Sequence, residues 1–235
     1  FVERSIDYMA PQVYWPIGSS GNDYSMITPW WYEVANKFGR HCYISQSLSG
    51  LKTTVSRKPI TNVAQNNFDA YEINKQLLLN QASTLEEAPG MVFFNASGFT
   101  KQNFIRVVTQ EVWTNKAKVP AMTWYKAPIQ KPVTQLKRSG QNVTWQHVAD
   151  TVRYGVYAIP TDKRNDADVI SSSKYYQGMS YTKSYTLDDS ITTDKFTIAV
   201  TPIDRFGNEW APAFLNEAVQ NAVKPVLTFP SNNGS

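Results

Sequence analysis

The segment that decides the fold runs from Ile6 to Trp15 and reads IDYMAPQVYW. It is largely apolar and ends in aromatic residues, which is typical of a buried β-strand. Residues 16–24, which follow, are rich in Gly, Ser and Asn, as loops are. We therefore expect a strand whose aromatic end emerges into a loop.

Two further strands are predicted farther along the chain. Cys42–Leu48 (CYISQSL) and Gly90–Asn95 (GMVFFN) are short runs rich in β-branched and aromatic residues, and both have the length of a buried strand. The first half of the chain thus holds three expected strands, each followed by a longer polar and apolar stretch.

Those longer stretches carry helix signals. Thr28 and Pro29 have the form of an N-cap followed by proline at the first helical position, so we expect a short helix over Trp30–Phe38. Asp69–Gln81 has an amphipathic pattern, which predicts a second helix. Thr100 is expected to cap a third helix. The apolar stripe of that helix, at spacings of four, is assigned to the core: Phe104, Val108 and Val112.

The resulting order of strand, helix, strand, helix, strand, helix indicates a parallel sheet with helical crossovers. A closed barrel of eight such units takes about 250 residues, so three strands cannot close one. The segment is either a small open α/β sheet or the C-terminal portion of a (β/α)8 TIM-type barrel. The chain begins at Phe1, a few residues before the first strand. We expect that the earlier barrel strands were removed.

Beyond residue 126 the sequence changes character. Lys126–Pro132 (KAPIQKP) is typical of a linker, and the runs after it are short, alternating and separated by Gly, Asp, Asn and Ser. The pattern predicts a β-sandwich over residues 127–215 with a C-terminal extension over 216–235, so the whole chain is α/β plus all-β. Lys195–Pro202 alternates like a half-buried strand, and three aromatic residues are expected in the core: Trp145, Tyr154 and Tyr157.

Composition excludes several classes of function. The net charge is +4, with 23 basic residues scattered among 19 acidic ones, which disfavours a nucleic-acid partner. No apolar run approaches the ~18–20 residues that cross a bilayer. The single cysteine, Cys42, cannot form an internal disulfide and is expected to be buried and inert. His41 and His147 have no carboxylates at ligand spacing, so neither a metal nor a cofactor is predicted.

A family resemblance rests on the same opening segment. Ile6–Trp15, followed by Tyr24 and the Trp30-Trp31 pair, resembles the "iDYi-P-Q-YW … Y … WW" pattern of the glycoside-hydrolase-like family 10 proteins, also called domain of unknown function 187. Gly90–Phe99 resembles the family's last barrel strand and Val119–Trp124 its closing segment. The resemblance covers residues 1–126, and residues 127–215 resemble a fibronectin type III domain. Together, these resemblances imply a secreted, periplasmic or cell-surface bacterial glycoside hydrolase that acts on carbohydrate.

The chemistry of glycoside hydrolysis directs attention to carboxylates. Such enzymes use two of them, and in barrels they lie at the carboxyl ends of strands. The three predicted strands end without Asp or Glu. Asp23, in the loop after the first strand, is the one acid expected near the catalytic face, and its alternative role is that of a solvated turn residue. The family's "D-D-Y-F-Y-P" type of acidic motif is absent, so we expect the catalytic pair to lie upstream.

The strand ends do offer groups that suit a sugar. Aromatic rings stack on pyranose faces, and amides bond to hydroxyl groups. The candidate substrate-binding residues are Gln12, Tyr14, Trp15, Asn95 and Trp31. Strand alternation aims Gln12 and Tyr14 to the same side, and an amide within an apolar strand needs a partner or a role. The aromatic members of the set have core packing as their alternative role.

Three functional hypotheses remain open at this point. The first is a C-terminal fragment of a secreted glycoside hydrolase, inactive by itself, with an accessory sandwich domain. The second is a carbohydrate-binding or interaction protein without hydrolytic activity, and the third is a structural spacer. An open sheet also leaves strand edges unpaired, which predicts a homodimer through those edges.

Overall fold

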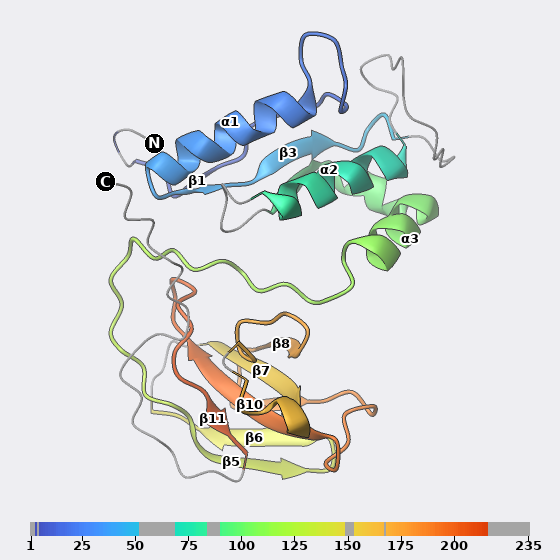
Figure 1. Cartoon of the computed structure of the whole chain (residues 1–235). Helices are drawn as coiled ribbons and strands as arrows, with labels where there is room; N and C mark the ends of the chain where they lie inside the picture. Colours follow the sequence, from blue (N-terminus) through green and yellow to red (C-terminus); the bar gives the residue numbers. More distant parts are fainter. Residues whose placement is uncertain are drawn as a thin grey trace. The chain divides into compact units, whose positions relative to one another are not determined.

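In a computed structural model, the described residues are Glu3 and the ranges 5–51, 69–83, 90–148, 153–166 and 168–215. The chain divides into two compact units, Phe1–Thr114 and Asn115–Ser235 (Figure 1). The expected extension over residues 216–235 lies outside the described residues.

Strands and helices alternate in the first unit as the sequence predicts, except that the strand expected over Cys42–Leu48 is divided into β2 (His41–Cys42) and β3 (Ile44–Ser47). The pairs β1 with β2 and β3 with β4 are parallel, and a parallel bridge from Gln12 to Ser45 continues the first pairing. The elements in order are β1 (Tyr8–Met9), α1 (Tyr24–Lys37), β2 (His41–Cys42), β3 (Ile44–Ser47), α2 (Ala70–Ala82), β4 (Met91–Phe94), the 3-10 helix η1 (Ala96–Thr100) and α3 (Gln102–Glu111). No closed barrel is formed by the described strands of this unit.

One face of this parallel sheet is covered by the three helices. Ile44 of β3 packs with Tyr24 and Tyr32 of α1, and Leu48 packs with residues of α2 and α3. The predicted stripe of α3 lies in the second of these clusters, where Phe104 is 1% exposed. Cys42 is also buried on this face, as predicted. Burial of the apolar stripes of the helices therefore holds the sheet from one side.

No helix of the described residues lies on the opposite face, which we call the helix-free face. Because parallel strands in register direct neighbouring side chains to the same side, the pairings of β1, β2, β3 and β4 define its members. Large side chains on it are exposed to solvent: Tyr8 by 56%, Val92 by 41% and Phe94 by 54%. The helix-free face comprises Tyr8, Gln12, Tyr14, His41, Tyr43, Ser45, Ser47, Val92 and Phe94.

Two predicted helix starts are wrong. α1 begins at Tyr24 rather than Trp30, because the Asp23 side chain caps it by accepting a hydrogen bond from Ser25 N, and Pro29 lies inside the helix. α3 is preceded by Lys101, which makes no side-chain cap. Thr100 instead ends η1, where its hydroxyl donates to Ser97 O at 2.7 Å.

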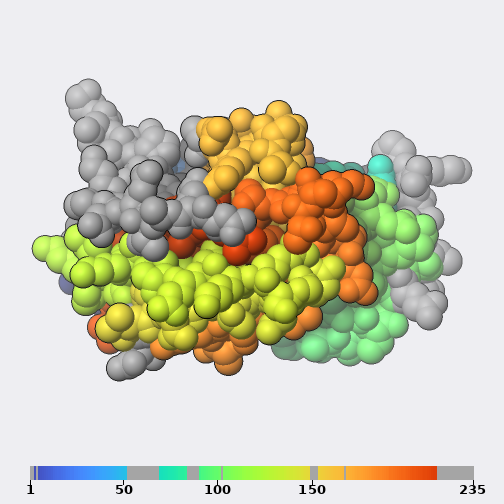
Figure 2. Space-filling model, turned by 90° about the horizontal axis from the view of Figure 1, so that it is seen from below, coloured from blue at the N-terminus to red at the C-terminus, as the bar shows by residue number. Residues whose placement is uncertain are grey.

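The second unit consists of two antiparallel sheets. One has the strand order β11-β10-β7-β8 and the other the order β5-β6-β9. β5 lies at the surface of the unit, in yellow-green across the face seen in Figure 2. The elements are β5 (Thr134–Ser139), β6 (Asn142–Gln146), β7 (Arg153–Pro160), the 3-10 helix η2 (Thr161–Lys163), β8 (Tyr176–Ser180), β9 (Ser184–Thr186), β10 (Phe196–Ile203) and β11 (Ala213–Phe214).

A single core joins these two sheets. Trp145 of β6 packs edge-on against Tyr154 of β7, with ring centroids 5.1 Å apart, and Val200 of β10 belongs to the same cluster. Trp145 and Tyr154 are therefore core residues, as predicted. Tyr157 is also buried, but it lies in a different cluster with Ile170.

The expectation of a half-buried strand over Lys195–Pro202 is wrong. Ile198 of β10 faces the core between the sheets, while Ala199 on the other side packs with Val169 and Ile170. The segment between β7 and β8 covers that second face, so both sides of β10 are buried. Alternation within the strand could not reveal this cover, because the covering residues lie about thirty positions earlier in the chain.

Residues 115–125, which we call the strap, pack with the second unit, although the sequence changes character only at residue 126. Met122 N donates to Phe206 O at 2.8 Å, and the Tyr125 ring stacks on Phe206 with centroids 4.8 Å apart. Lys118 Nζ lies 2.8 Å from Glu209 Oε2. These contacts place the division between the units at Thr114.

Candidate functional site

The predicted site residues gather at the carboxyl ends of the parallel strands of the first unit. Gln12, Ser45 and Val92 lie side by side in register. Two residues after Gln12 comes Tyr14, and three after Val92 comes Asn95. The carboxyl ends of parallel strands meet at one edge of a sheet, so the fold brings these two strand ends to the same edge.

Gln12 and Tyr14 lie on the helix-free face. The side chain of Gln12 is exposed and that of Tyr14 is half-buried. Their common orientation agrees with the prediction from strand alternation. Because Gln12 reaches solvent, its amide needs no buried partner and can contact a polar ligand.

The tryptophans of the first unit differ in their exposure. Trp15 and Trp31 are half-buried and pack against the cluster around Val13 and Tyr24. Trp30 is 55% exposed, and its ring meets that of Trp31 edge-on at a centroid distance of 4.7 Å. Of this neighbouring pair, it is thus Trp30 that presents the larger aromatic surface to solvent.

Asn95 follows β4 directly and caps η1. Its side-chain oxygen accepts hydrogen bonds from Ser97 N at 3.0 Å and from Ser97 Oγ. The residue is exposed. The oxygen of the Asn95 amide is thus occupied within the loop, and the amide nitrogen is the group that remains to contact a ligand.

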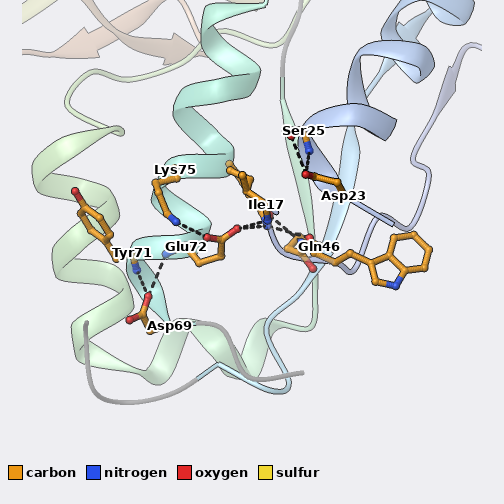
Figure 3. Close-up of polar contacts among 10 residues, drawn as sticks. Ile17, Asp23, Ser25, Gln46, Asp69, Tyr71, Glu72 and Lys75 are labelled. Carbon is orange, nitrogen blue, oxygen red and sulfur yellow. Dashed lines mark hydrogen bonds and ion pairs between the residues drawn. The ribbon is translucent and has the colours of Figure 1, made fainter. Parts of the chain in front are cut away.

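Asp23 serves as the N-cap of α1. Its Oδ1 accepts hydrogen bonds from Ser25 N at 2.8 Å and from Ser25 Oγ at 2.7 Å (Figure 3). Partial burial raises the pKa of Asp23, but the hydrogen bonds from Ser25 and from the backbone at Gly18 outweigh it and hold the pKa below the usual 3.8. A carboxylate with a lowered pKa stays ionised near neutral pH, which is unsuited to a general acid.

Replacing Asp23 by Ala is expected to destabilise the first unit by about 1 kcal/mol at pH 7, because the cap of α1 is lost. The folded pKa is lowered, so the contribution of the charge is fully present above the unfolded pKa and is lost as pH falls through the folded pKa. The difference between wild type and Asp23→Ala should therefore shrink below about pH 4. Asp23→Asn keeps the cap without the charge and should show little of this pH dependence. Urea denaturation between pH 3 and pH 7 measures both.

The structure also reveals a buried polar network that the sequence analysis missed. Glu72 and Gln76 of α2 and Gln46 of β3 are each 0% exposed. Glu72 Oε2 forms an ion pair of 2.6 Å with Lys75 Nζ, and Figure 3 shows Glu72 between Lys75 and the backbone of Ile17. This network is hydrogen-bonded to the backbone of the segment that carries Tyr14 and Trp15.

A signal for this network is present in the sequence. Glu72, Gln76 and Asn80 recur every four residues on α2, beside the buried Ile73 and Leu77. Polar residues on the apolar face of a helix require buried partners, and Asn80 Oδ1 indeed accepts a hydrogen bond of 3.0 Å from Tyr24 OH. The identity of the partners could not be read, because they come from distant segments.

The two histidines, His41 and His147, have different hydrogen-bond partners. His41 Nδ1 lies 3.0 Å from Tyr43 OH, and burial lowers the pKa of His41. Burial likewise lowers the pKa of His147, whose Nε2 donates to Lys131 O at 2.9 Å. No group of three or more His, Cys, Asp or Glu able to hold a metal occurs within the described ranges. No helix in the described part of the chain is long and apolar enough to span a bilayer.

Comparison with known proteins finds distant relatives. The chain is distantly related to bacterial glycosyl hydrolases. It is 25% identical over 225 residues, or 88% of its length, to Glycosyl hydrolase YngK of Bacillus subtilis (strain 168). It is 30% identical over 102 residues, or 43% of its length, to Glycosyl hydrolase DigH of Escherichia coli O6:H1. The matches span 40% and 22% of the lengths of these relatives. No family model matches the chain, and no solved structure matches it.

Proposed function

We propose that this chain is the C-terminal part of a glycosyl hydrolase of the family-10-like group, and that its first unit supplies the last three strand–helix units of a (β/α)8 barrel. The observation that carries the proposal is the helix-free face. A barrel has its helices outside and strand side chains inside, so a barrel segment must show parallel strands covered on one face only. The distant relation to YngK and DigH supports the same assignment.

In this proposal Gln12, Tyr14, Trp15, Asn95 and Trp31 contribute to sugar subsites. Tyr14 and Gln12 lie toward the carboxyl end of the first strand, on the face that becomes the barrel interior. Active sites of (β/α)8 enzymes are built at that end of the barrel. A half-exposed phenol ring can stack on a pyranose, and the Gln12 amide can bond to its hydroxyl groups.

The catalytic carboxylates are assigned to the upstream part of the barrel. Within the described residues of the first unit, the acids near the carboxyl ends have other roles: Asp23 caps α1, Asp69 caps α2, and Glu72 is buried in an ion pair with Lys75. Two opposed carboxylates about 5–10 Å apart are what glycoside hydrolysis requires. The chain alone is therefore expected to bind sugar without cleaving it.

The second unit is proposed to be a fibronectin type III-like accessory domain. Its described strands form a four-stranded sheet and a three-stranded sheet, both antiparallel, around one core that contains Trp145. Seven strands in two such sheets are the arrangement of immunoglobulin-like sandwiches. The unit has no cysteine in its sequence, so no disulfide pins its sheets.

The decisive experiment compares this chain with the same chain extended upstream in its gene. Both are incubated with mixed polysaccharides and aryl glycosides, and reducing ends and released aglycone are measured. We expect cleavage by the extended chain and none by the shorter one. Cleavage by the shorter chain would overturn the assignment of the acids. If the extended chain is inert and yet retains glycan, the protein is instead a carbohydrate-binding module.

The role of Tyr14 is tested in the extended chain. Tyr14→Ala should lower kcat/KM about fivefold, since one aromatic stacking contact contributes about 1 kcal/mol. Tyr8→Ala is the matched control, because Tyr8 lies on the same face but at the amino end of its strand, where it is 56% exposed. Equal activity of the Tyr14→Ala variant and wild type would remove Tyr14 from the site.

A further inference from the structure

The backbone beyond the first strand is held by side chains instead of by a neighbouring strand. Val13 N donates to Ser45 O at 3.0 Å, which is the last backbone bond of that strand pairing among the described residues. Three backbone groups at alternate positions are then bonded by side chains. Val13 O accepts from Gln46 Nε2 at 3.0 Å, Trp15 O accepts from Gln76 Nε2 at 3.2 Å, and Ile17 N donates to Glu72 Oε1 at 2.7 Å.

The side chains that make these bonds are themselves linked in a row. Gln46 Nε2 also donates to Gln76 Oε1 at 2.8 Å, and Gln76 Nε2 also donates to Glu72 Oε1 at 3.1 Å. Gln46 Oε1 accepts from Ser47 N at 2.8 Å. Each of the two amides therefore uses both of its N–H groups and its oxygen. Neither amide can turn without breaking several bonds at once.

The charge of the row is balanced at one end. Glu72 is fully buried, and Lys75 Nζ, on a side chain 36% exposed, lies 2.6 Å from Glu72 Oε2. The ionised Glu72 strengthens the hydrogen bonds that it accepts from Ile17 N and from Gln76. Replacing both partners of a buried hydrogen bond by apolar groups of the same shape can be nearly neutral for stability. The main effect of this row is therefore to fix the geometry of the backbone that it bonds.

We infer that Gln46, Glu72 and Gln76 are positioning residues that set the path of residues 13–17 and thereby present Tyr14 and Trp15 to carbohydrate. The inference rests on the proposed function for its sugar-binding part. Its structural part stands on the hydrogen bonds alone. α2 thus acts on the site through the backbone of residues 13–17, and its own side chains need not touch sugar.

The test replaces Gln76 by Met in the full chain. Met has a similar volume and removes every hydrogen bond of the amide. Hydrogen exchange of the backbone amides of Tyr14, Trp15 and Ile17 should become at least tenfold faster, while exchange in α3 and β10 stays unchanged. Gln81→Met is the matched control, since Gln81 lies on the same helix and is exposed. If Gln76→Met does not fold, Gln76→Asn keeps an amide of shorter reach and should loosen the same residues.

Sugar binding supplies the functional readout. Tryptophan fluorescence is titrated with cellopentaose, xylopentaose and chitopentaose. Where the wild-type chain binds one of them, Gln76→Met should weaken that binding about tenfold and Gln81→Met should leave it unchanged. Exchange of the Tyr14, Trp15 and Ile17 amides at the wild-type rate would overturn the inference, as would unchanged sugar affinity alongside faster exchange. If exchange rises locally but the wild-type chain binds none of the three sugars, the positioning role stands and the proposed function loses its support.

Discussion

Replacing Lys118 by Met is expected to lower the free energy of unfolding of the second unit by about 3–5 kcal/mol, because it leaves a buried carboxylate without its cation. Glu209 is 2% exposed, and Lys118 Nζ lies 2.8 Å from its Oε2. Lys118 Nζ also donates to Tyr157 OH at 3.1 Å and to Ile170 O at 3.0 Å. One lysine thus joins the strap to three separate segments of the unit.

The other oxygen of Glu209 strengthens this expectation. Thr201 Oγ1 donates to Glu209 Oε1 at 2.6 Å, and Tyr157 OH donates to the same atom. Burial, together with the charge of Glu209 and its hydrogen bond, raises the pKa of Tyr157 above its usual range, so the phenol keeps its proton. Tyr157 and Thr201 are neutral donors and cannot replace the charge of Lys118.

The effect of Lys118→Met is measured by urea denaturation of the full chain, with hydrogen exchange of β7 and β10 reporting on the second unit. Lys126→Met is the control, since Lys126 is exposed in the same unit, and it should change stability by less than about 0.5 kcal/mol. Adding Glu209→Gln to Lys118→Met should restore part of the loss. Equal stability of Lys118→Met and Lys126→Met would show that the Lys118–Glu209 ion pair does not stabilise the unit.

Replacing Phe104 by Ala is expected to destabilise the first unit by about 3–5 kcal/mol, through lost burial and the cavity that remains. Phe104 is 1% exposed and lies at the centre of an aromatic cluster. Its ring centroid lies 5.8 Å from that of Phe93, 5.5 Å from that of Phe99 and 6.3 Å from that of Trp113. Phe99 belongs to η1, so the loop that carries Asn95 should loosen as well.

Phe94→Ala is the matched control for Phe104→Ala. Phe94 lies on the helix-free face and is 54% exposed, so its loss should cost less than about 1 kcal/mol. Thermal unfolding followed by far-ultraviolet circular dichroism gives the difference, and hydrogen exchange of residues 96–100 reports on η1. A loss for Phe104→Ala no greater than that for Phe94→Ala would mean that α2 and α3 do not share the core around Leu48 described above.

Much of the fold was predictable where a local pattern carries the information. The stripe at Phe104, Val108 and Val112 predicted the buried face of α3, since a spacing of four residues repeats one helix face. The start of α1 was less predictable, because Asp23 and Thr28 are both N-cap residue types. Which of these two residues caps the helix depends on where the chain leaves the preceding loop, and tertiary packing decides that position.

The candidate site was predictable in part. The aromatic end of IDYMAPQVYW pointed to Tyr14 and Trp15, because strand ends that open into a loop are where binding residues occur. The roles of Gln46 and Gln76 could not be predicted, since the residues around each of them do not indicate its hydrogen-bond partners. Their role becomes visible only where β3 and α2 bring both amides to the backbone of residues 13–17.

By itself, the sequence determined the alternation of strands and helices in the first unit, the succession of strands in the second, and the burial of Cys42. These are properties of periodicity and composition, which act over a few residues. Only the tertiary structure decided which sheet face stays free of helices, and that Lys118 neutralises Glu209 across 91 positions of the chain. Such pairings depend on the register and packing of distant segments, and no local pattern of residue types specifies them.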